Sequence, residues 1–242
     1  DCDTTPLVDD VTGKVYVACT NNTNRGTPGR AGADEANPRA ENRDGHVVEI
    51  AEAGGDQTAT SFTWNLLLLC CDPATNSSAY FAGFPAAQVS PISCPDNLAF
   101  DSVGNLWIST DGAPSTIGYN DGLFRVTLEG PNRGNVEQFL AVPRESETCG
   151  PVIHDAERHV FVAVQHPGED GSFEAQNSFF PDFVAAGAQA PAGAFAGPRP
   201  TIVQVLPKEQ LVEVPVTPTP TVSPTATPAP TSAPPLTPTA TP

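Results

Sequence analysis

Oxygen-bearing side chains flank one short apolar stretch of the sequence. In "SCPDNLAFDSVGNLWISTDG", which begins at Ser93, Asp96 and Asn97 precede and Asp111 follows the apolar run Leu106-Trp107-Ile108. Carboxylate and amide oxygens are the ligands that hard cations such as Ca²⁺ prefer. The alternative for each acid is that it caps a turn through hydrogen bonds to its own backbone. The candidates of this kind along the chain are Asn21, Asn22, Asp96, Asn97, Asp111, Asp121 and Glu147.

The overall charge favours cations as partners. The chain has 242 residues, with 11 basic and 28 acidic side chains and a formal charge of −17. Nucleic acids and anionic membranes need clustered Lys and Arg, so neither is an expected partner. The longest apolar run, 66–71, is far shorter than the roughly 20 residues of a membrane helix. The chain contains no Met and shows no signal peptide, so we expect a mature or truncated product.

Cysteine and histidine spacing excludes several common sites. None of the six cysteines forms a C-x-x-C pair, and the four histidines show no H-E-x-x-H spacing. Zinc and thioredoxin-like chemistry therefore lack support. No Ser-His-Asp set is evident for a covalent nucleophile. The cysteines could form disulfides in an exported protein or simply fill the core, and the sequence leaves both open.

The C-terminal segment has the composition of a stalk. Residues 214–242 read "VPVTPTPTVSPTATPAPTSAPPLTPTATP" and contain no aromatic side chain. Repeated Pro excludes helix and central strand and favours extended polyproline II. We therefore divide the chain into a folded part, 1–213, and a disordered Thr/Pro-rich stalk or linker, 214–242, with cell-wall association through this tail as one role. The alternative is an extension without a role.

Repeated hairpins organise the folded part. The segments "DDVTGKVYVACT" from Asp9, "DSVGNLWIST" from Asp101 and "HDAERHVFVAV" from His154 each place a polar turn before a strand with one aromatic residue. A second unit, Asp-Gly followed by an alternating strand, recurs in "RDGHVVEI" and "NDGLFRV". These pairs predict an all-β chain of about three four-stranded blades, with inserted loops near 22–42 and 71–93. Closed propellers need roughly four to eight blades, so the prediction is a partial β-propeller.

A propeller would bring the candidate ligands together. Its inner strands run toward a central channel, so acidic side chains at matching strand ends would form a polyanionic ring that a metal ion neutralises. His166 follows the predicted strand "VFVAVQ" and would lie near the channel mouth, where it could orient phosphate or protonate a leaving group. The alternative for His166 is a solvent-exposed turn residue.

Several blocks along the chain resemble a known family. In order they are "TGKVYVACTNNT", "NPRAENRDGHVVEI", "FTWNLLLL", "SCPDNLAFDSVGNLWISTDG", "NDGLFRV", "ETCGPV", "VFVAVQHPGE" and "PRPTIVQV". Over residues 8–206 this order is similar to that of PhoX-type alkaline phosphatases. The resemblance implies a usually exported propeller that hydrolyses phosphate monoesters at a cluster of iron (Fe³⁺) and calcium (Ca²⁺). By motif, Asp96 and Glu147 resemble metal ligands; Asn97, Asp111 and Asp121 are placed by their neighbourhood alone.

Two family elements are missing. The family's R-P-E element, whose Arg holds phosphate, would fall within "DCDTTPLVDD", where no Arg stands. The upstream T-C-E-E block, whose Cys ligates iron, is absent from this sequence. The resemblance therefore implies a phosphatase, while this chain alone could be an incomplete or inactive C-terminal portion.

Two other functions remain open at this point. A calcium-dependent lactonase-like propeller also contains a "PDN…D…GNLW" pattern, although "QHPGE" and "NPRAENR" do not belong to it. A non-catalytic module displayed at the surface on the Thr/Pro stalk is the other. For the phosphatase we expect a phosphomonoester substrate, a monomeric protein and a secreted, periplasmic or cell-surface location.

Overall fold

Alternating apolar and polar residues make β-strands the dominant element of the chain. The computed structural model describes residues 6–10, 12–156, 158–182 and 197–210. In β11 (His159–Gln165), Val160, Val162 and Val164 are buried, and the residues between them face the other way. That period of two is the pattern of a strand with one face in a core.

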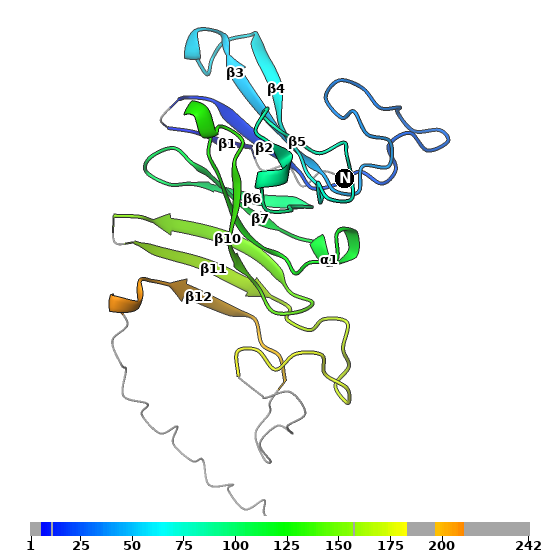
Figure 1. Ribbon diagram of the computed structural model, residues 1–242, viewed down its shortest axis with the longest axis vertical. Helices are drawn as coiled ribbons and strands as arrows, with labels where there is room; N and C mark the ends of the chain where they lie inside the picture. The colour runs from blue at the N-terminus through cyan, green and yellow to red at the C-terminus, as the bar shows by residue number, and fades with distance from the viewer. Residues whose placement is uncertain (1–5, 11, 157, 183–196, 211–242) are drawn as a thin grey trace, which may run out of the picture. The chain divides into compact units, whose positions relative to one another are not determined.

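Three antiparallel sheets contain all the named strands of the described residues, and in each sheet consecutive strands are neighbours (Figure 1). The first sheet holds β1 (Pro6–Val8), β2 (Val15–Cys19), β3 (His46–Glu52), β4 (Phe62–Leu69) and β5 (Tyr80–Phe81). The second holds β6 (Pro95–Phe100), β7 (Leu106–Thr110), β8 (Gly122–Val126) and β9 (Val136–Ala141). The third holds β10 (Glu147–His154), β11 and β12 (Thr201–Val205). Short helical turns connect them: α1 (Ala113–Thr116), and the 3₁₀ turns Ala53–Gly55, Ala86–Gln88, Gly130–Asn132 and Lys208–Gln210.

The predicted all-β class is confirmed, and the expected four strands in every sheet are found only in the second. The first sheet has five strands because β1 and the short β5 add to its two edges. The third has three among the described residues. The inserted loops lie where the sequence indicated: isolated bridges pair Asn22 with Asn42 and Cys71 with Ile92 across their bases. Closure of such sheets into a propeller remains a prediction.

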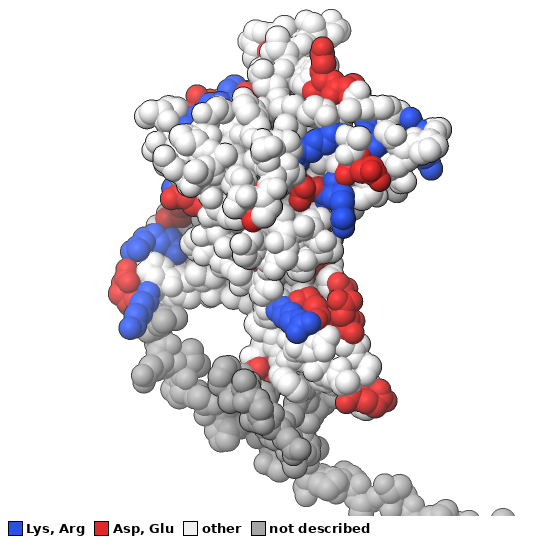
Figure 2. Space-filling view, turned by 45° about the vertical axis from the view of Figure 1, so that its right-hand side comes forward, with Lys and Arg blue, Asp and Glu red and all other residues white. Residues whose placement is uncertain are grey.

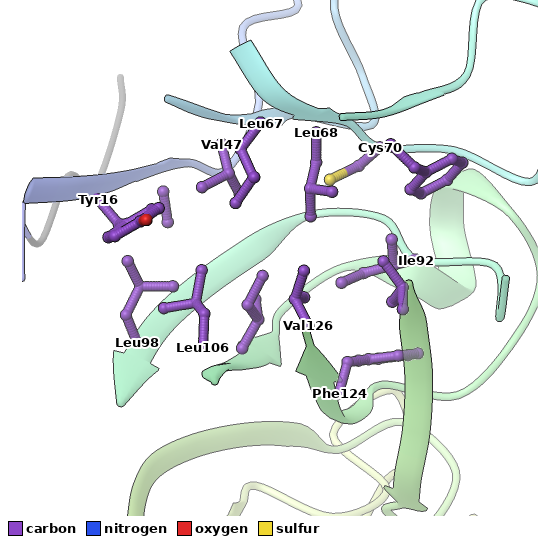
Figure 3. Packing of buried hydrophobic residues seen from close by; sticks show 14 of the residues in the cluster. Tyr16, Val47, Leu67, Leu68, Cys70, Ile92, Leu98, Leu106, Phe124 and Val126 are labelled. Atoms are coloured by element: carbon purple, nitrogen blue, oxygen red, sulfur yellow. The ribbon is translucent and has the colours of Figure 1, made fainter. Parts of the chain in front are cut away.

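The first and second sheets pack face to face through an apolar core. Figure 3 shows Tyr16, Val47 and Leu68 pointing from the first sheet toward Leu106 and Val126 of the second, and all of these are buried. Burying one such side chain stabilises the fold by about 1.5–3 kcal/mol. A smaller cluster joins the second sheet to the third.

The aromatic residue of each repeated hairpin faces in the same direction along the stack. Tyr16 of the first sheet packs into the core shared with the second sheet. Trp107 of the second sheet packs instead against Val160 of the third. Phe161 of the third sheet lies on the opposite face from Val160, because neighbouring residues of a strand alternate. The repeat seen in the sequence is therefore also a repeat of packing.

One end of the stack gathers loops from all three sheets. β6 and β10 begin there and β7 and β11 end there, and the long loop between β2 and β3, α1 and the segment after β11 lie on the same side (Figure 1). Gly45 joins two sheets at this end: its φ is +75°, and a Cβ would lie 2.1 Å from the Thr20 carbonyl oxygen and 2.8 Å from the Pro95 ring. Only glycine fits such a close crossing. We call this the pocket end, and the opposite end the turn end.

The chain divides into residues 1–210 and 211–242. The predicted stalk, 214–242, lies outside the described residues and stays a prediction. Within the described ranges, no helix has the length and apolar character needed to cross a membrane. Four of the described cysteines, Cys70, Cys71, Cys94 and Cys149, are free thiols.

Candidate functional site

Asp96 and Asn97 lie at an irregularity in the edge strand of the second sheet. They are the second and third residues of β6, inside the strand rather than before it as the sequence indicated. The register between β6 and β7 shifts between Pro95 and Leu98, so these two residues occupy a β-bulge. Bulges re-aim side chains and are common beside functional sites. Pro95 has no N–H to donate, which is compatible with this break in the ladder.

Glu147 is the first residue of β10, with a side chain 10% exposed. One of its oxygens, Oε2, accepts a hydrogen bond from the Gln165 side-chain amide. The same oxygen lies 3.2 Å from His166 Nε2. Gln165 pairs with Glu147 across the β10–β11 ladder, so the sheet register itself places the two side chains together. The carboxylate is therefore held by one oxygen in a fixed orientation.

The electrostatic environment of Glu147 is unfavourable to its charge. Burial raises the pKa of this carboxyl, and the negative charges of Asp111 and Asp96 raise it further. The contact with His166 acts in the opposite direction and lowers it, without reversing the result. The pKa of the Cys149 thiol is raised as well, first by burial and then by Glu147, Asp96 and Asp111. The structure thus brings three of the predicted ligands, Asp96, Asp111 and Glu147, into one electrostatically coupled group.

A pocket of about 270 Å³ opens beside this group. We call it the carboxylate pocket. Its lining residues are Asp111, Gly112, Pro114, Ser115, Asp121, Glu145, Ser146, Glu147, His166, Glu169 and Asp170. Figure 2 views the molecule with the loops of the pocket end turned forward, and acidic groups there lie next to basic ones. Six carboxylates line this pocket, and one of them, Glu145, already pairs with Arg144 at 2.8 Å.

Asp121 lines the pocket but serves a structural purpose there. Its side chain is only 3% exposed. One oxygen accepts hydrogen bonds from the Thr110 hydroxyl (2.7 Å) and the Ala113 N–H (3.0 Å), and the other accepts from the Gly112 N–H (3.0 Å). These donors include first-turn N–H groups of α1, which would otherwise lack partners. The carboxylate of Asp121 therefore caps α1, the alternative that the sequence left open for this residue.

Asn97 also makes a structural contact. Its side-chain oxygen accepts a hydrogen bond from the Gly150 N–H at 2.8 Å, which ties β6 of the second sheet to β10 of the third. Gly150 itself lies where the β10–β11 register shifts, between Cys149 and Val152. The bond therefore joins the irregularities of two strands and fixes the spacing of Asp96 and Glu147.

His166 lies directly after β11, as the sequence indicated. Its backbone has a φ of +33°, uncommon for a residue with a side chain, so surrounding contacts hold it there. Nε2 faces Glu147, and Nδ1 lies 3.1 Å from a Glu169 oxygen, outside hydrogen-bond geometry and shielded from solvent. His166 is thus enclosed between two carboxylates and is not a fully exposed turn residue.

Asn21 and Asn22 are not brought to the carboxylate pocket. Asn22 bridges to Asn42, its N–H donating to the Asn42 carbonyl at 2.6 Å, and lines a separate small pocket with Asn24, Arg25 and Arg30. Asn21 stands beside it at the start of the same loop.

The carboxylate oxygens at this site are of the type that binds a hard metal ion, but they are too few to complete its coordination. Hard cations such as Ca²⁺ take carboxylate oxygens, and repulsion among Asp96, Asp111 and Glu147 is what such an ion would relieve. Ca²⁺ needs about six to eight oxygen ligands. Across the described ranges, no three His, Cys, Asp or Glu side chains converge closely enough to hold one ion. These residues therefore supply part of a coordination shell.

Some residues of the site were not singled out from the sequence. Gln165, Glu145, Glu169 and Asp170 contact Glu147 or line the pocket, and three of them fall in or beside the block "QHPGED". In the sequence, that block indicated a histidine and a family resemblance, but no role for these three side chains. The alternation of β11 could have indicated Gln165, because it puts Gln165 on the face opposite Val164 at the strand end.

Comparisons with known proteins show what this chain is similar to. The family model described as alkaline phosphatase PhoX matches residues 3–168. Among solved structures, Pseudomonas fluorescens PhoX in complex with vanadate, a transition state analogue, superposes with a TM-score of 0.63 and 26% sequence identity. The match covers 83% of this chain and 32% of that one, so this chain spans about a third of the length of that relative. No curated protein matches the chain.

Proposed function

Since the chain belongs to the alkaline phosphatase PhoX family, we propose that its carboxylate pocket forms one side of a metal-dependent site that hydrolyses phosphate monoesters. The observation that carries the proposal is the coupling of Glu147 with Asp96 and Asp111 beside a small acidic pocket. A buried carboxylate whose charge is disfavoured by neighbouring acids needs a cation to be stable in its ionised form.

The proposed metal ions are Ca²⁺ and Fe³⁺, as the family resemblance implies. Asp96, Asp111 and Glu147 would hold them from this side of the site, through hard oxygen donors. When bound, such ions neutralise phosphate oxygens and supply an activated oxygen nucleophile for the hydrolysis. These three side chains are the part of the ligand set that the described residues supply.

The protein's own side chains have distinct tasks in this proposal. Gln165 and His166 both hold Oε2 of Glu147, which fixes the direction of the carboxylate. Asn97 maintains the spacing between β6 and β10 through Gly150. We further propose that His166 gives a proton to the leaving group, which would require its ring to turn away from Glu147.

The wider architecture is part of the proposal. Three sheets stacked face to face, each of consecutive antiparallel strands, support a partial β-propeller with the pocket end at its channel. We extend the proposal to a secreted, periplasmic or cell-surface location, with residues 214–242 as a stalk.

Hydrolysis of p-nitrophenyl phosphate tests the proposal. The purified full chain, loaded with calcium and iron, should release p-nitrophenol, and Glu147→Gln should lower kcat at least about 100-fold because a ligand charge is lost. Glu137→Gln is the matched control: Glu137 pairs with Arg125 at an exposed site of the second sheet, and its loss should leave the rate unchanged.

The outcomes separate the open alternatives. Hydrolysis that survives Glu147→Gln would contradict the proposed site. Binding of calcium without any hydrolysis would favour a non-catalytic module. Cleavage of a lactone with no action on the phosphate ester would favour the lactonase-like alternative.

A further inference from the structure

Most arginines of this acidic protein are already paired. Of the nine in the sequence, six form ion pairs with carboxylates: Arg25, Arg125, Arg133, Arg144, Arg158 and Arg199. Arg39 donates to three backbone carbonyls, of Leu69, Cys70 and Ser78. Among the described residues, Arg30, Arg39 and Arg43 lack an acidic partner, and of these three only Arg30 and Arg43 are exposed. Both lie in the segment between β2 and β3, at the pocket end.

The backbone that carries Arg43 is held firmly. The neighbouring Asn42 is buried and accepts a hydrogen bond from the Gly45 N–H at 3.2 Å. On the other side, the Asp44 carbonyl accepts from the Cys94 N–H at 2.8 Å, and the Asp44 side chain accepts from the Ser93 hydroxyl at 3.0 Å. Arg43 therefore stands on a turn fixed to both the first and the second sheet, and Gly45 makes that close approach possible.

The side chain of Arg43 is exposed and reaches the rim of the carboxylate pocket. Its guanidinium makes one long contact, 3.5 Å, to the Ser115 carbonyl oxygen. Ser115 is in α1 and lines the carboxylate pocket together with Asp111 and Glu147. A single weak bond to a carbonyl leaves most of the five N–H donors of a guanidinium available to another group.

The chemistry of the proposed substrate calls for such a group. A phosphomonoester is a dianion and must approach a surface whose formal charge is −17. Guanidinium binds phosphate through two parallel charge-assisted hydrogen bonds, which are about twice as strong as neutral ones. We propose that Arg43 binds the phosphate group of the substrate at the mouth of the carboxylate pocket. This inference rests on the proposed function of that pocket.

Arg30 provides a matched control. It is exposed, carries the same charge and belongs to the same loop, but it lines the small pocket of Asn22, Asn24 and Arg25 instead. A general effect of lost positive charge would appear equally in Arg30→Gln and Arg43→Gln. A specific contact with phosphate would appear only in Arg43→Gln.

The first test is steady-state kinetics of the metal-loaded full chain on p-nitrophenyl phosphate. Arg43→Gln should raise KM and the inhibition constant of inorganic phosphate about tenfold or more. The KM and inhibition constant of Arg43→Lys should lie between those of the parent and of Arg43→Gln, because lysine keeps the charge and loses the planar fork. Arg30→Gln should match the parent. Equal KM and inhibition constants in Arg43→Gln and the parent would overturn the inference while leaving the phosphatase proposal intact.

The second test does not depend on turnover. Titration calorimetry with inorganic phosphate as the probe measures binding to the metal-loaded parent, Arg43→Gln and Arg30→Gln, with thermal melting as the check that each is folded. Binding weakened about tenfold in Arg43→Gln alone supports the inference even if no hydrolysis is seen. Absence of phosphate binding by the folded parent, or equal affinity in all three proteins, overturns it.

Discussion

Carboxylate side chains lie at both ends of the second and third sheets, but their surroundings differ. Those at the turn end accept hydrogen bonds that lower their energy, whereas those at the pocket end lie near other acids. At the turn end, Asp101 accepts hydrogen bonds from the Asn105 N–H, the Asn105 side chain and the Trp107 indole, at 2.8, 2.8 and 3.1 Å. Asp155 accepts there from the N–H and hydroxyl of Ser102, which lower its pKa. At the pocket end, burial and neighbouring acids raise the pKa of Glu147.

This difference separates stability from function within one set of strands. Asp101 is matched by donors of its own turn, and Asp155 by Ser102 in the turn of the neighbouring sheet, so both stabilise the fold. The grouped carboxylates of the pocket end repel one another, a cost to the fold that is typical of a binding site. Position at the pocket end does not by itself make a carboxylate a candidate ligand. Asp121 lies at that end, yet it accepts three hydrogen bonds and stabilises the fold as Asp101 does.

The largest effect should follow from removing Asp101. Asp101→Ala deletes the bonds to Asn105 and leaves the Trp107 indole N–H, in a largely buried residue, without its acceptor. We expect the free energy of unfolding to fall by about 3 kcal/mol, measured by urea denaturation. The calcium-induced rise in melting temperature should be the same as in the parent. If Asp101→Ala abolished the calcium-induced rise in melting temperature, the turn end would also take part in calcium binding, and the proposed difference between the two ends would be wrong.

Asp121→Asn should have the next largest effect. Either orientation of the new amide turns an N–H₂ group toward the donors Thr110, Gly112 or Ala113, so one bond becomes a repulsive contact. We expect a loss of about 2 kcal/mol in unfolding free energy, with calcium binding retained. Loss of bound calcium at unchanged stability would instead make Asp121 a ligand, as its position in the sequence first indicated.

The smallest expected effect concerns how the free energy of unfolding depends on pH. The contributions of the two ends should change in opposite directions with pH, as measured on chelator-treated protein. The folded-state pKa of Glu147 is raised, so the folded state binds more protons, and stability should fall as pH rises from about 4.3 through the raised value. The pKa of Asp155 is lowered, so its contribution is present above about 3.9 and is lost as pH falls through the lowered value.

Variants separate these two contributions. Glu147→Gln should remove the fall in stability on the alkaline side, and Asp155→Asn should weaken the fall on the acid side. Urea midpoints from pH 3 to 8 give both curves. A Glu147→Gln curve that coincides with the parent over the whole range would mean that the carboxylates of the pocket end do not repel one another.

The sequence predicted the strands well because each carries its own local signal. Polar turns before Val15, Leu106 and His159 and alternating residues within the strands required no knowledge of the rest of the chain. The bulge at Asp96 and Asn97 was missed, since a register shift depends on the partner strand β7. α1 was missed too, because its cap, Asp121, lies eight residues after Ala113 and not at the usual position before the helix.

The candidate site was predictable in part for the same reason. Motif and neighbourhood placed Asp96, Asp111, Glu147 and His166 at strand ends, and the structure couples them. The sequence could not distinguish Asp121 from these residues. Its side chain is also a carboxylate, but it accepts three hydrogen bonds within the protein. The approach of Glu147 to the acids of the second sheet depends on the contact between β6 and β10, and contacts between sheets leave no trace in local sequence.

The number of calcium ions bound tests the central claim most directly, namely that Asp96, Asp111 and Glu147 bind metal while Asp101 and Asp155 hold turns. Titration calorimetry should be run on the parent, on Asp96→Asn/Asp111→Asn/Glu147→Gln, and on Asp101→Asn/Asp155→Asn. We predict that the first variant loses calcium binding while remaining folded, because its neutral side chains keep the shape, and that the second is less stable but binds calcium as the parent does. Equal calcium binding by the parent and the first variant would contradict the account.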